Sequence, residues 1–380
     1  MAKNKYKVKK TILFVVNADW FFLSHRLAIA QRALEEGFIV HLAAEITDKR
    51  KELEAYGLIL HDLQMKRSST SLLQNLGLLL KILKIYKKLK PDLIHLITIK
   101  PVIIGSLAAH LFFASKKLVL SISGLGYVFT TGGFKAFFRK EMIILLYKLV
   151  FMHRYLKVIF QNKNDLNTIC DFTNLNKKNT ILIPGSGVDL DKFRFKNPPK
   201  SKPIVLFPAR IIASKGIYEF VDCAKKLNNI ARFVVVGKRD VDSRDCIKLE
   251  ELEIWEKDGI IEYWGDCDDM PNIFSKSSIV VLPSYREGMP KSLLEAAASG
   301  RPVVTTNIPG CRDAIINGLT GFLVPLYDVT LLTKEVKKLL ENPKMIRDMG
   351  EEGRLLAEKK FDLIKVVNTH LKIYNNLLSK

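Results

Sequence analysis

Two series of short apolar runs alternate with helix-forming stretches along this chain, and this alternation constrains the fold more than any other feature. Short β-branched runs that do not alternate with polar residues are typical of strands buried on both faces of a parallel sheet. Strands separated by helices predict βαβ units with right-handed crossovers. In the first half the pattern predicts strands at Ile12–Val16, Ile39–Ala43, Leu93–Leu96, Leu118–Ser121 and Val158–Phe160, and helices over Ser24–Glu36, over 102–115 and from Asn162.

A second series follows residues 196–203, a segment rich in Pro and Lys that is predicted to be a linker. The tail, residues 361–378, has apolar residues at helical spacing. At 380 residues the chain is long enough for two domains, each with its own core. The strands of this second series are predicted at Ile204–Phe207, Phe233–Val236, Ile260–Trp264, Ile279–Leu282 and Val303–Thr305.

Two carboxylates, Glu287 and Glu295, follow the predicted strand Ile279–Leu282. Pro290 is placed to open a helix, so Glu287 is expected in the strand-to-helix loop and Glu295 about one turn into the helix. In an open α/β sheet, ligands bind off the carboxyl ends of the strands. Backbone amides at a helix N-terminus suit an anionic ligand, and carboxylates accept hydrogen bonds from sugar hydroxyls.

This spacing resembles the E-x(7)-E motif of the retaining glycosyltransferases of family 4. Four further segments are similar to signatures of that family and occur in its order. Together they cover most of residues 180–326, which makes the resemblance more specific than any one motif would. These segments are Ile183–Phe193, Phe207–Gly216, Arg301–Thr306 and Gly318–Pro325.

The resemblance implies a GT-B fold, an α/β architecture of two Rossmann-like domains that face each other across a cleft. The first, acceptor-side domain is expected at residues 1–185, joined by a C-terminal helix at 363–380 that crosses back to it. Residues 186–362 are expected to form the domain that binds a nucleotide sugar.

The resemblance also assigns the donor site. Arg210 and Lys215 match the pair that binds the donor diphosphate, and two cations there would stabilise the charge on the leaving group. Glu295 matches the residue that binds the ribose, and Glu287 the one near the donor sugar. Catalytic roles are expected for Arg210, Lys215 and Glu287, and no metal ion or cofactor is expected. The remaining expected donor-binding residues are Gly265, Gly288, Met289, Pro290 and Leu294.

The first half departs from the family pattern. Residues 17–22 lack the Gly-Gly turn that the family often has after its first strand. His25 and Arg26 resemble a pair found in members that act on lipid-linked acceptors. Ser123 and Gly124 stand where many members have a histidine. These four residues are expected on the acceptor side. Two other histidines, His95 and His110, are expected to be core residues because they lie on apolar elements.

Charge is distributed unevenly along the chain. The formal net charge is +21, and residues 1–200 hold 33 Lys and Arg against 14 Asp and Glu. A basic half indicates an anionic partner: nucleic acid, a membrane surface or a phosphorylated substrate. Here basic residues alternate with large aliphatic residues, which favours an anionic membrane surface over a nucleic-acid groove. Two ordinary core-facing helices with solvated lysines remain the alternative. The basic residues concerned are Lys81, Lys84, Lys87, Lys88, Lys135, Arg139 and Lys140.

Other sequence features indicate the cellular location of the protein. The five cysteines are scattered and odd in number, which favours reduced thiols over a disulfide framework or zinc site. No apolar stretch reaches the ~18 residues that a spanning helix needs, and the N-terminus does not resemble a signal peptide. A cytoplasmic protein, peripheral at the inner face of the cytoplasmic membrane, is expected.

The function that the resemblance implies is transfer of a hexose or N-acetylhexosamine with retention of configuration. The expected donor is a nucleotide diphosphate sugar, most simply a UDP-sugar. The expected acceptor is a polyprenyl-diphosphate-linked sugar in the synthesis of O-antigen, capsule or a related bacterial glycan. Two alternatives stay open: a UDP-N-acetylhexosamine 2-epimerase of the same architecture, and a basic nucleic-acid-binding protein, although no recognition helix or aromatic platform is evident.

Overall fold

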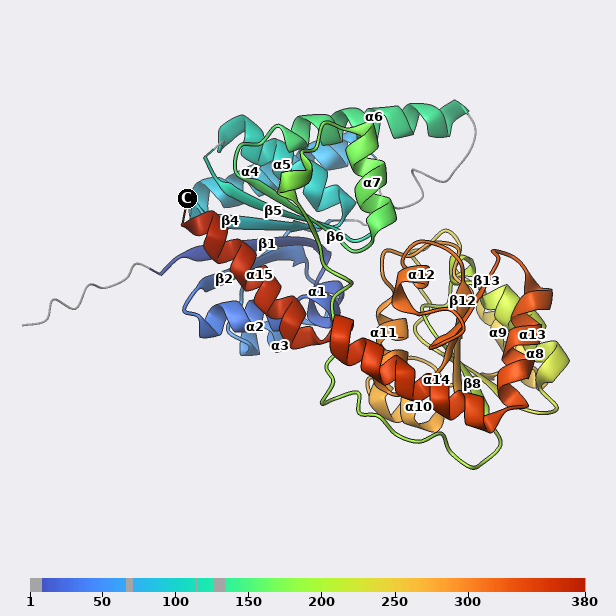
Figure 1. Cartoon of the computed structure of the whole chain (residues 1–380). Coiled ribbons are helices and arrows are strands. Elements are labelled where there is room, and N and C mark those ends of the chain that lie inside the picture. The colour runs from blue at the N-terminus through green and yellow to red at the C-terminus, as the bar shows by residue number, and fades with distance from the viewer. Residues whose placement is uncertain (1–8, 66–70, 114, 126–133, 380) are drawn as a thin grey trace, which may run out of the picture. The chain divides into compact units, whose positions relative to one another are not determined.

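The chain forms two compact units, each built on a parallel sheet (Figure 1). The structure, a computed structural model, describes residues 9–65, 71–113, 115–125 and 134–379. The first unit comprises residues 1–183 and 366–380, and the second comprises residues 184–365.

The sheet of the first unit has the strand order β3-β2-β1-β4-β5-β6-β7, and every adjacent pair is parallel. The order reverses between β1 and β4, which is the switch point where open α/β sheets bind ligands. The strands are β1 (Thr11–Ala18), β2 (Ile39–Glu45), β3 (Ile59–Asp62), β4 (Leu93–Ile97), β5 (Lys117–Ile122), β6 (Leu156–Phe160) and β7 (Thr180–Leu182).

Helices cover both faces of this sheet, and alternate strand residues contact each layer. Leu13 and Val15 of β1 belong to the apolar cluster that residues of α4, α5, α6 and α7 complete, while Phe14 contacts Phe22 of α1 and Tyr374 of α15. Figure 1 shows α4, α5 and α6 on one side of the sheet. The helices are α1 (Asp19–His25), α2 (Leu27–Glu35), α3 (Arg50–Ala55), α4 (Leu72–Leu89), α5 (Ile99–Phe112), α6 (Phe134–Phe151), α7 (Lys163–Phe172) and α15 (Leu363–Leu378).

The start of the first unit differs from the sequence-based prediction. One helix was expected over Ser24–Glu36 after a loop at 17–22, but α1 already begins at Asp19 and a break at Arg26 separates it from α2. Arg26 has φ −135° and ψ −11°, outside the helical range. Asp19, buried in the first turn, accepts hydrogen bonds from the backbone and hydroxyl of Thr47, which fixes the start of α1.

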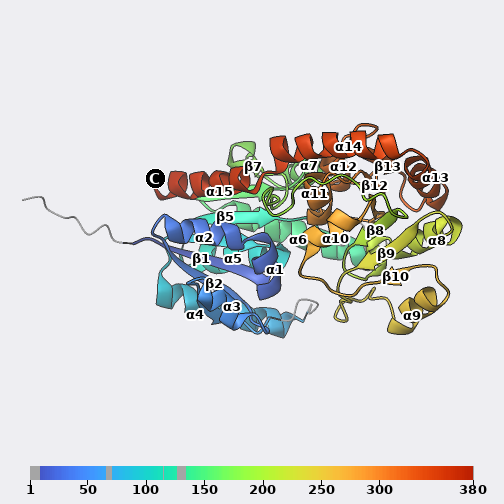
Figure 2. The same ribbon diagram turned by 90° about the horizontal axis from the view of Figure 1, so that it is seen from below.

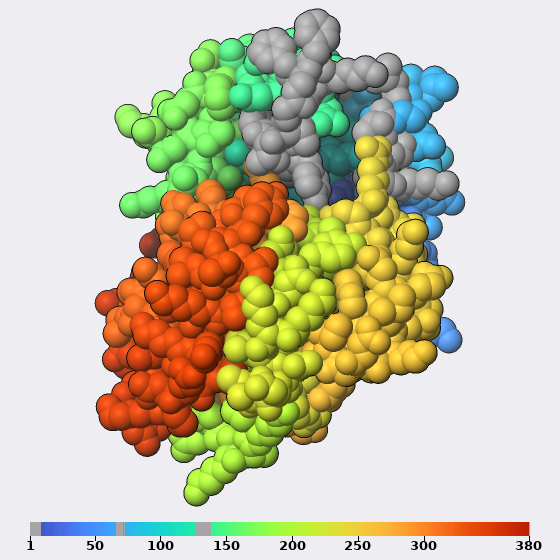
Figure 3. Space-filling model, turned by 90° about the vertical axis from the view of Figure 1, so that its right-hand side faces the viewer, coloured from blue at the N-terminus to red at the C-terminus, as the bar shows by residue number. Residues whose placement is uncertain are grey.

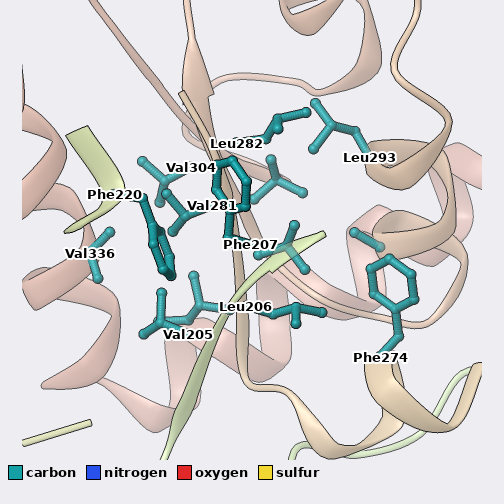
Figure 4. Packing of buried hydrophobic residues seen from close by; sticks show 14 of the residues in the cluster. Val205, Leu206, Phe207, Phe220, Phe274, Val281, Leu282, Leu293, Val304 and Val336 are labelled. Carbon is teal, nitrogen blue, oxygen red and sulfur yellow. The ribbon is translucent and has the colours of Figure 1, made fainter. Parts of the chain in front are cut away.

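The sheet of the second unit has the order β10-β9-β8-β11-β12-β13 and is also parallel throughout. Its apolar side chains form a two-sided core: Phe220 and Val336 lie on one side of the strands, and Phe274 and Leu293 on the other (Figure 4). The strands are β8 (Ile204–Pro208), β9 (Arg232–Val236), β10 (Glu262–Tyr263), β11 (Ile279–Leu282), β12 (Val303–Thr306) and β13 (Gly321–Val324).

The helices of the second unit also form two layers. Helices α8 and α13 pack side by side on one face (Figure 3), and α11 packs against α10 and α14. The helices are α8 (Ile217–Leu227), α9 (Leu249–Lys257), α10 (Met270–Lys276), α11 (Lys291–Ala298), α12 (Cys311–Ala314), α13 (Val329–Leu340) and α14 (Pro343–Leu356).

Residues 196–203, the predicted linker, lie inside the second unit and do not separate the two units. The buried guanidinium of Arg301 donates to the carbonyl of Lys196 at 2.7 Å, which holds the segment against its own unit. The chain passes between units at Ile183–Pro184 and again at Lys365–Val366, each within three residues of the domain bounds expected from the resemblance.

The C-terminal helix returns to the first unit, as the resemblance implies. After α14 a π-helical turn, Ala357–Phe361, leads into α15, whose residues from Val366 belong to the first unit (Figure 2). The hydroxyl of Tyr374 shares a 2.6 Å hydrogen bond with Nδ1 of His95 on β4, so α15 is attached to the sheet by a buried polar contact. No helix among the described residues is both long and apolar enough to span a membrane.

Candidate active site

Two loops at the carboxyl ends of β8 and β11 bring Lys215 and Glu287 together. The Lys215 ammonium forms an ion pair with Oε1 of Glu287, and the Ser284 hydroxyl donates to the same oxygen at 2.8 Å. The Lys215 and Glu287 side chains are only 17% and 11% exposed, so their interaction is screened less than a surface pair would be. The site therefore presents a cation and a carboxylate held in one fixed geometry.

A close backbone approach holds these loops together. Gly216 has φ +80°, and a Cβ atom at that position would lie 2.1 Å from the carbonyl oxygen of Pro283. The amide of Tyr285 donates to the carbonyl of Ser214 at 2.9 Å, which adds a second link between the same loops. Gly216 also begins α8, whose first-turn amides and dipole favour an anion at this edge of the sheet.

Arg210, the second predicted cation, follows β8 but is paired elsewhere. Its guanidinium forms an ion pair with Asp240, which lies after β9. The Arg210 side chain is 38% exposed, so this pair leaves part of the guanidinium accessible to a ligand. The structure thus places both predicted cations on one loop and gives each a different carboxylate partner.

Glu295 lies in the second turn of α11, as its place in the sequence predicted. The carboxylate is 8% exposed and is 3.4 Å from the Lys291 ammonium, one turn earlier on the helix. Burial raises the pKa of Glu295, while the ammonium groups of Lys291 and Lys192 lower it. A buried carboxylate with one cation beside it is suited to accept hydrogen bonds from hydroxyl groups.

The loop between Glu287 and α11 is buried and closely packed. Pro290 occupies the N-cap position, so α11 begins at Lys291, one residue later than a first-turn proline would place it. A Cβ atom at Gly310 would lie 2.5 Å from the carbonyl oxygen of Gly288, and one at Gly185 would lie 2.8 Å from Cγ of Met289. The predicted loop and helix residues Gly288, Met289, Pro290 and Leu294 are all buried.

Gly265 lies on a neighbouring loop that follows β10. Its backbone has φ +73°, and its carbonyl accepts a 2.8 Å hydrogen bond from the amide of Gly237, which follows β9. The hydroxyl of Tyr263 donates to the carbonyl of Gly237 at 3.0 Å. These contacts join the loops after β9 and β10 at the same edge as the loops that carry Lys215 and Glu287.

The predicted acceptor-side residues are in the first unit. His25 ends α1, where its ring stacks on Phe21 at 4.3 Å between centroids and its Nδ1 is hydrogen-bonded to the Ser24 hydroxyl. Arg26 is only 2% exposed, and burial lowers the pKa of its guanidinium to about 10. Burial lowers the pKa of His370, and the charge of Arg26 lowers it further. Arg26 therefore contributes to the interior of this unit, whereas His25 is half-buried.

Ser123 and Gly124 follow β5 and are half-buried. The Ser123 hydroxyl is buried and has no hydrogen-bond partner within the described part of the chain, and Gly124 has φ +126°. His95 is a satisfied core histidine, as predicted, because its Nε2 shares a 2.7 Å hydrogen bond with Ser121 and its Nδ1 contacts Tyr374. His110 is half-buried on α5.

Three polar residues of this site were not found from the sequence: Asp240, Ser284 and Lys291. Lys291 could have been found, because it stands four residues before Glu295 on one helix face. Asp240 and Ser284 act through contacts that depend on loop geometry, which sequence spacing does not specify. Over the described ranges, no group of three or more His, Cys, Asp and Glu side chains is arranged to hold a metal ion.

Comparison with protein families gives two matches that follow the two units. Residues 11–162 match the model described as "Glycosyl transferase 4-like", and residues 189–356 match "Glycosyl transferases group 1".

Similar curated proteins span nearly the whole chain. One is the N,N'-diacetylbacillosaminyl-diphospho-undecaprenol alpha-1,3-N-acetylgalactosaminyltransferase of Campylobacter jejuni, 30% identical over 90% of this chain and 92% of the relative. The capsular polysaccharide biosynthesis glycosyltransferase CapM of Staphylococcus aureus is 26% identical over 86% and 90%. The UDP-Gal:alpha-D-GlcNAc-diphosphoundecaprenol alpha-1,3-galactosyltransferase of Escherichia coli is 26% identical over 81% of each chain.

Solved structures share the architecture. The sucrose-phosphate synthase of Thermosynechococcus elongatus matches with a TM-score of 0.81 at 21% identity, over 98% of this chain and 100% of the other. Anabaena HepE, solved with UDP and glucose, matches with a TM-score of 0.77 at 16% identity, over 96% and 99%. The predicted GT-B fold is confirmed, and the chain belongs to the group 1 glycosyltransferases, the family 4 enzymes that its motifs resemble.

Proposed function

We propose that this glycosyltransferase moves a hexose or N-acetylhexosamine from a UDP-sugar to a polyprenyl-diphosphate-linked sugar, in the synthesis of a bacterial surface polysaccharide. The observation that carries the proposal is the Lys215–Glu287 pair at the N-terminus of α8, because it combines an anion site with a carboxylate. The names of the Campylobacter jejuni and Escherichia coli relatives, which include a diphosphoundecaprenol sugar, support this acceptor class.

The donor is assigned to residues 186–362, which lie in the second unit. Lys215 and Arg210 bind the diphosphate, and the first-turn amides of α8 complete the anion site. Glu295 accepts hydrogen bonds from the ribose, and Glu287 accepts one from the sugar. Gly288, Met289, Pro290 and Leu294 form the wall beside the sugar and ribose, and Gly265 contacts the base. The UDP and glucose bound by Anabaena HepE support a UDP-sugar donor.

Transfer proceeds with retention by front-face substitution. The bond from the anomeric carbon to the diphosphate breaks, and the bond to the acceptor oxygen forms on the same face. The acceptor proton passes to the departing phosphate oxygen. Glu287 Oε1 already accepts from Lys215 and Ser284, which supports a role in binding the sugar over one as a nucleophile. Lys215 and Arg210 stabilise the diphosphate as negative charge develops, so this step needs no metal ion.

The acceptor is assigned to residues 1–185 and the C-terminal helix 363–380, nearly all of which lie in the first unit. His25, Ser123 and Gly124 follow β1 and β5 at the carboxyl edge of its sheet, where ligands of open α/β sheets bind. Arg26 acts indirectly, by fixing the break between α1 and α2 that positions His25.

The basic first unit is proposed to bind an anionic membrane surface, not nucleic acid. On α4 the side chains of Leu73, Leu76 and Leu80 are exposed, and the exposed Lys84, Lys87 and Lys88 continue the same face. On α6 a row of exposed apolar side chains follows steps of four and three residues, which places them on one helical face. An apolar face flanked by lysines suits a bilayer interface, at the inner side of the cytoplasmic membrane. The row consists of Phe138, Met142, Leu145 and Leu149 on α6 and of Met152, which directly follows this helix.

Two of the basic residues named in the sequence analysis make contacts within the first unit. The Lys81 ammonium donates to the carbonyl of Leu63 and to Oε1 of Gln64, and Lys140 lies 4.3 Å from the ring centroid of Phe172. The Lys135 side chain lies outside the described residues. Lys84, Lys87 and Lys88 therefore carry the electrostatic part of this proposal.

The test is a donor screen with the purified full-length chain. UDP-linked hexoses and N-acetylhexosamines are offered with a short polyprenyl-diphosphate-linked sugar as acceptor, and NMR reads the anomeric configuration of the product. One UDP-sugar should be used well above the others, with the donor configuration kept. Inversion would contradict the front-face step. Sugar interconversion at C2 without any acceptor would instead identify an epimerase.

A further inference from the structure

A pocket of about 260 Å³ opens in the first unit between α4 and the ends of two strands. Its floor is apolar and buried, formed by Leu63 and Met65, which follow β3, and by Leu78 of α4. Lys100, which follows β4 and lies in the first turn of α5, lines it as well. The pocket is therefore at the carboxyl edge of the sheet, where ligands of this architecture bind.

Lysine and amide side chains surround the apolar floor. The Lys81 ammonium is oriented by hydrogen bonds to the Leu63 carbonyl at 3.2 Å and to the Gln64 amide oxygen at 2.8 Å. These acceptors use two of its three N–H groups. Gln74 and Asn75 add amide groups from the first turn of α4. Two ammonium groups and several amides over an apolar floor suit an amphiphile with an anionic head.

The second ammonium is partly desolvated. Burial lowers the pKa of Lys100, while the carboxylate of Glu45 raises it. A partly buried cation gains more from an anionic ligand than one in free solvent, because the interaction is less screened. The N-terminus of α5, a helix of 14 residues, carries the positive end of the helix dipole and also favours an anionic ligand.

The volume of the pocket limits the size of the ligand that it can hold. A volume of about 260 Å³ is below the ~300–1,000 Å³ typical of sites that enclose drug-sized molecules. The pocket thus fits a diphosphate with the groups next to it, and not a whole nucleotide sugar.

Gly77 gives the pocket an open side toward the exposed leucines. At about 100° per residue, Gly77 lies between Leu73 and Lys81 around α4. Gly77 lines the pocket, and a Cβ atom at that position would have no neighbour within 4 Å among the residues that the structure describes. An acyl or prenyl chain can therefore leave the pocket over Gly77 and reach the exposed leucines of α4, because the glycine has no side chain to block it.

We propose that this pocket binds the diphosphate of the lipid-linked acceptor, with Lys81 and Lys100 at the phosphate oxygens and the lipid chain leaving over Gly77. This inference rests on the proposed function for the identity of the acceptor. It places the charged head of the acceptor in the first unit beside the helix that would contact the bilayer.

The first experiment measures KM for a short polyprenyl-diphosphate-linked sugar in three variants. Lys81→Ala removes an oriented cation, and loss of a charged hydrogen bond of this kind should raise the acceptor KM about 10-fold or more. Gly77→Trp should raise the same KM by filling the open side of the pocket. Donor KM should stay within about twofold, because a local contact to the acceptor does not bind the donor. Lys51→Ala, which removes an exposed lysine from α3 of the same unit, is the charge control.

Gly77→Ala is the matched control for the glycine. It adds one methyl group in open space and should favour the helix, so acceptor KM should remain at the wild-type value. If Gly77→Trp and Lys81→Ala both keep the acceptor KM of Lys51→Ala, the pocket assignment is wrong.

A direct binding experiment separates this inference from the proposed function. With UDP at saturation to occupy the donor site, farnesyl diphosphate and inorganic pyrophosphate are titrated calorimetrically into the full chain and into Lys81→Ala. Farnesyl diphosphate should bind more tightly than pyrophosphate, and the substitution should weaken both. Equal affinity for the two ligands would indicate a site for a free anion and overturn the lipid-linked assignment. Absence of transfer to any lipid-linked acceptor would refute the proposed function, while the titration would still decide whether the pocket binds diphosphate.

Discussion

The ammonium of Lys215 and the carboxylate of Glu287 form an ion pair across two loops that are 72 residues apart in sequence. The pair stands at the N-terminus of α8 and is largely buried. A nucleotide diphosphate that binds there adds negative charge next to Lys215, so the ammonium would be shared between ligand and protein. In the proposed donor site, the carboxylate would hold the lysine in place when the donor is absent.

Removal of either predicted diphosphate cation should reduce turnover strongly. Lys215→Ala or Arg210→Ala deletes charge stabilisation at the leaving group, and comparable electrostatic sites lose about 10²–10³ in kcat. Steady-state kinetics and thermal unfolding of both variants measure the effect on activity and on the fold. Lys225→Ala, which breaks an exposed pair with Asp222, is the control. Near-normal turnover in both active-site variants would exclude the assigned role.

Activity should survive removal of divalent metal ions. If Arg210 and Lys215 neutralise the diphosphate, these cations take the part that Mg²⁺ plays in metal-dependent transfer. Initial rates with EDTA should therefore stay close to those without it. Loss of activity in EDTA with recovery on addition of Mg²⁺ or Mn²⁺ would contradict this arrangement.

Glu295 should make the stability of the protein depend on pH. Burial raises the pKa of this carboxyl in the folded chain above its ordinary value of 4.5. Its contribution to stability is therefore fully present below the unfolded-state pKa and is lost as pH rises through the raised folded-state pKa. Urea unfolding across this window should show wild type losing free energy of unfolding relative to Glu295→Gln.

Lys291 provides the control for this pH effect. Its ammonium lowers the pKa of Glu295, so Lys291→Met should extend the pH-dependent loss to higher pH. A constant difference between wild type and Glu295→Gln at every pH would mean that the carboxyl titrates alike in both states. Glu295→Gln should also weaken UDP binding, because an amide accepts fewer hydroxyl hydrogen bonds than a carboxylate.

The sequence predicts the strands of this protein better than the contacts between its loops. The strand Ile279–Leu282 was predicted with its observed bounds, because a short, continuous β-branched run is typical of a parallel strand buried on both faces. Strands β3, β7 and β13 were not predicted. In β3, His61 and Asp62 interrupt the apolar run, and in β13 Gly321 has φ +156°, which only the backbone reveals.

In the candidate site, too, the positions of residues on elements could be predicted, whereas the contacts between loops could not. The places of Glu287 and Glu295 relative to α11 follow from their spacing and from Pro290. The pairing of Arg210 with Asp240 does not, because it depends on how the loops after β8 and β9 meet. The predicted linker at 196–203 gives another example: composition marks an irregular segment, but only a contact such as Arg301 to Lys196 shows which unit holds it.

Gly216 should be intolerant of substitution even by alanine. A non-glycine residue at positive φ costs about 1–2 kcal/mol, and here the added Cβ would also meet the Pro283 carbonyl oxygen at 2.1 Å. Gly216→Ala should therefore lower Tm and displace Lys215 from Glu287, with a loss of turnover. Gly318→Ala is the matched control, since Gly318 has φ +78° but no atom of the described residues lies within 4 Å of its Cβ position. Equal Tm values for the two variants would show that the loops after β8 and β11 can separate without cost.

Membrane attachment should depend on both charge and apolar contact. Each basic residue near an anionic bilayer contributes about 1 kcal/mol, and this attraction is screened by salt. Vesicles with anionic lipid should sediment with the protein at low salt and release part of it as salt rises. Charge reversal at Lys84, Lys87 and Lys88 should weaken sedimentation, while turnover of a water-soluble acceptor analogue stays unchanged.

The row on α6 separates the apolar contribution from the electrostatic one. Leu145→Glu and Met142→Glu place carboxylates in a row whose members are 59% and 54% exposed, so the fold should tolerate them. These variants should lose the salt-resistant part of vesicle binding, because this part comes from buried apolar area and is insensitive to ionic strength. Unchanged salt-resistant binding would exclude α6 from the interface. A wild-type dimer in analytical ultracentrifugation that both substitutions convert to monomers would assign the row to a second copy of the chain instead.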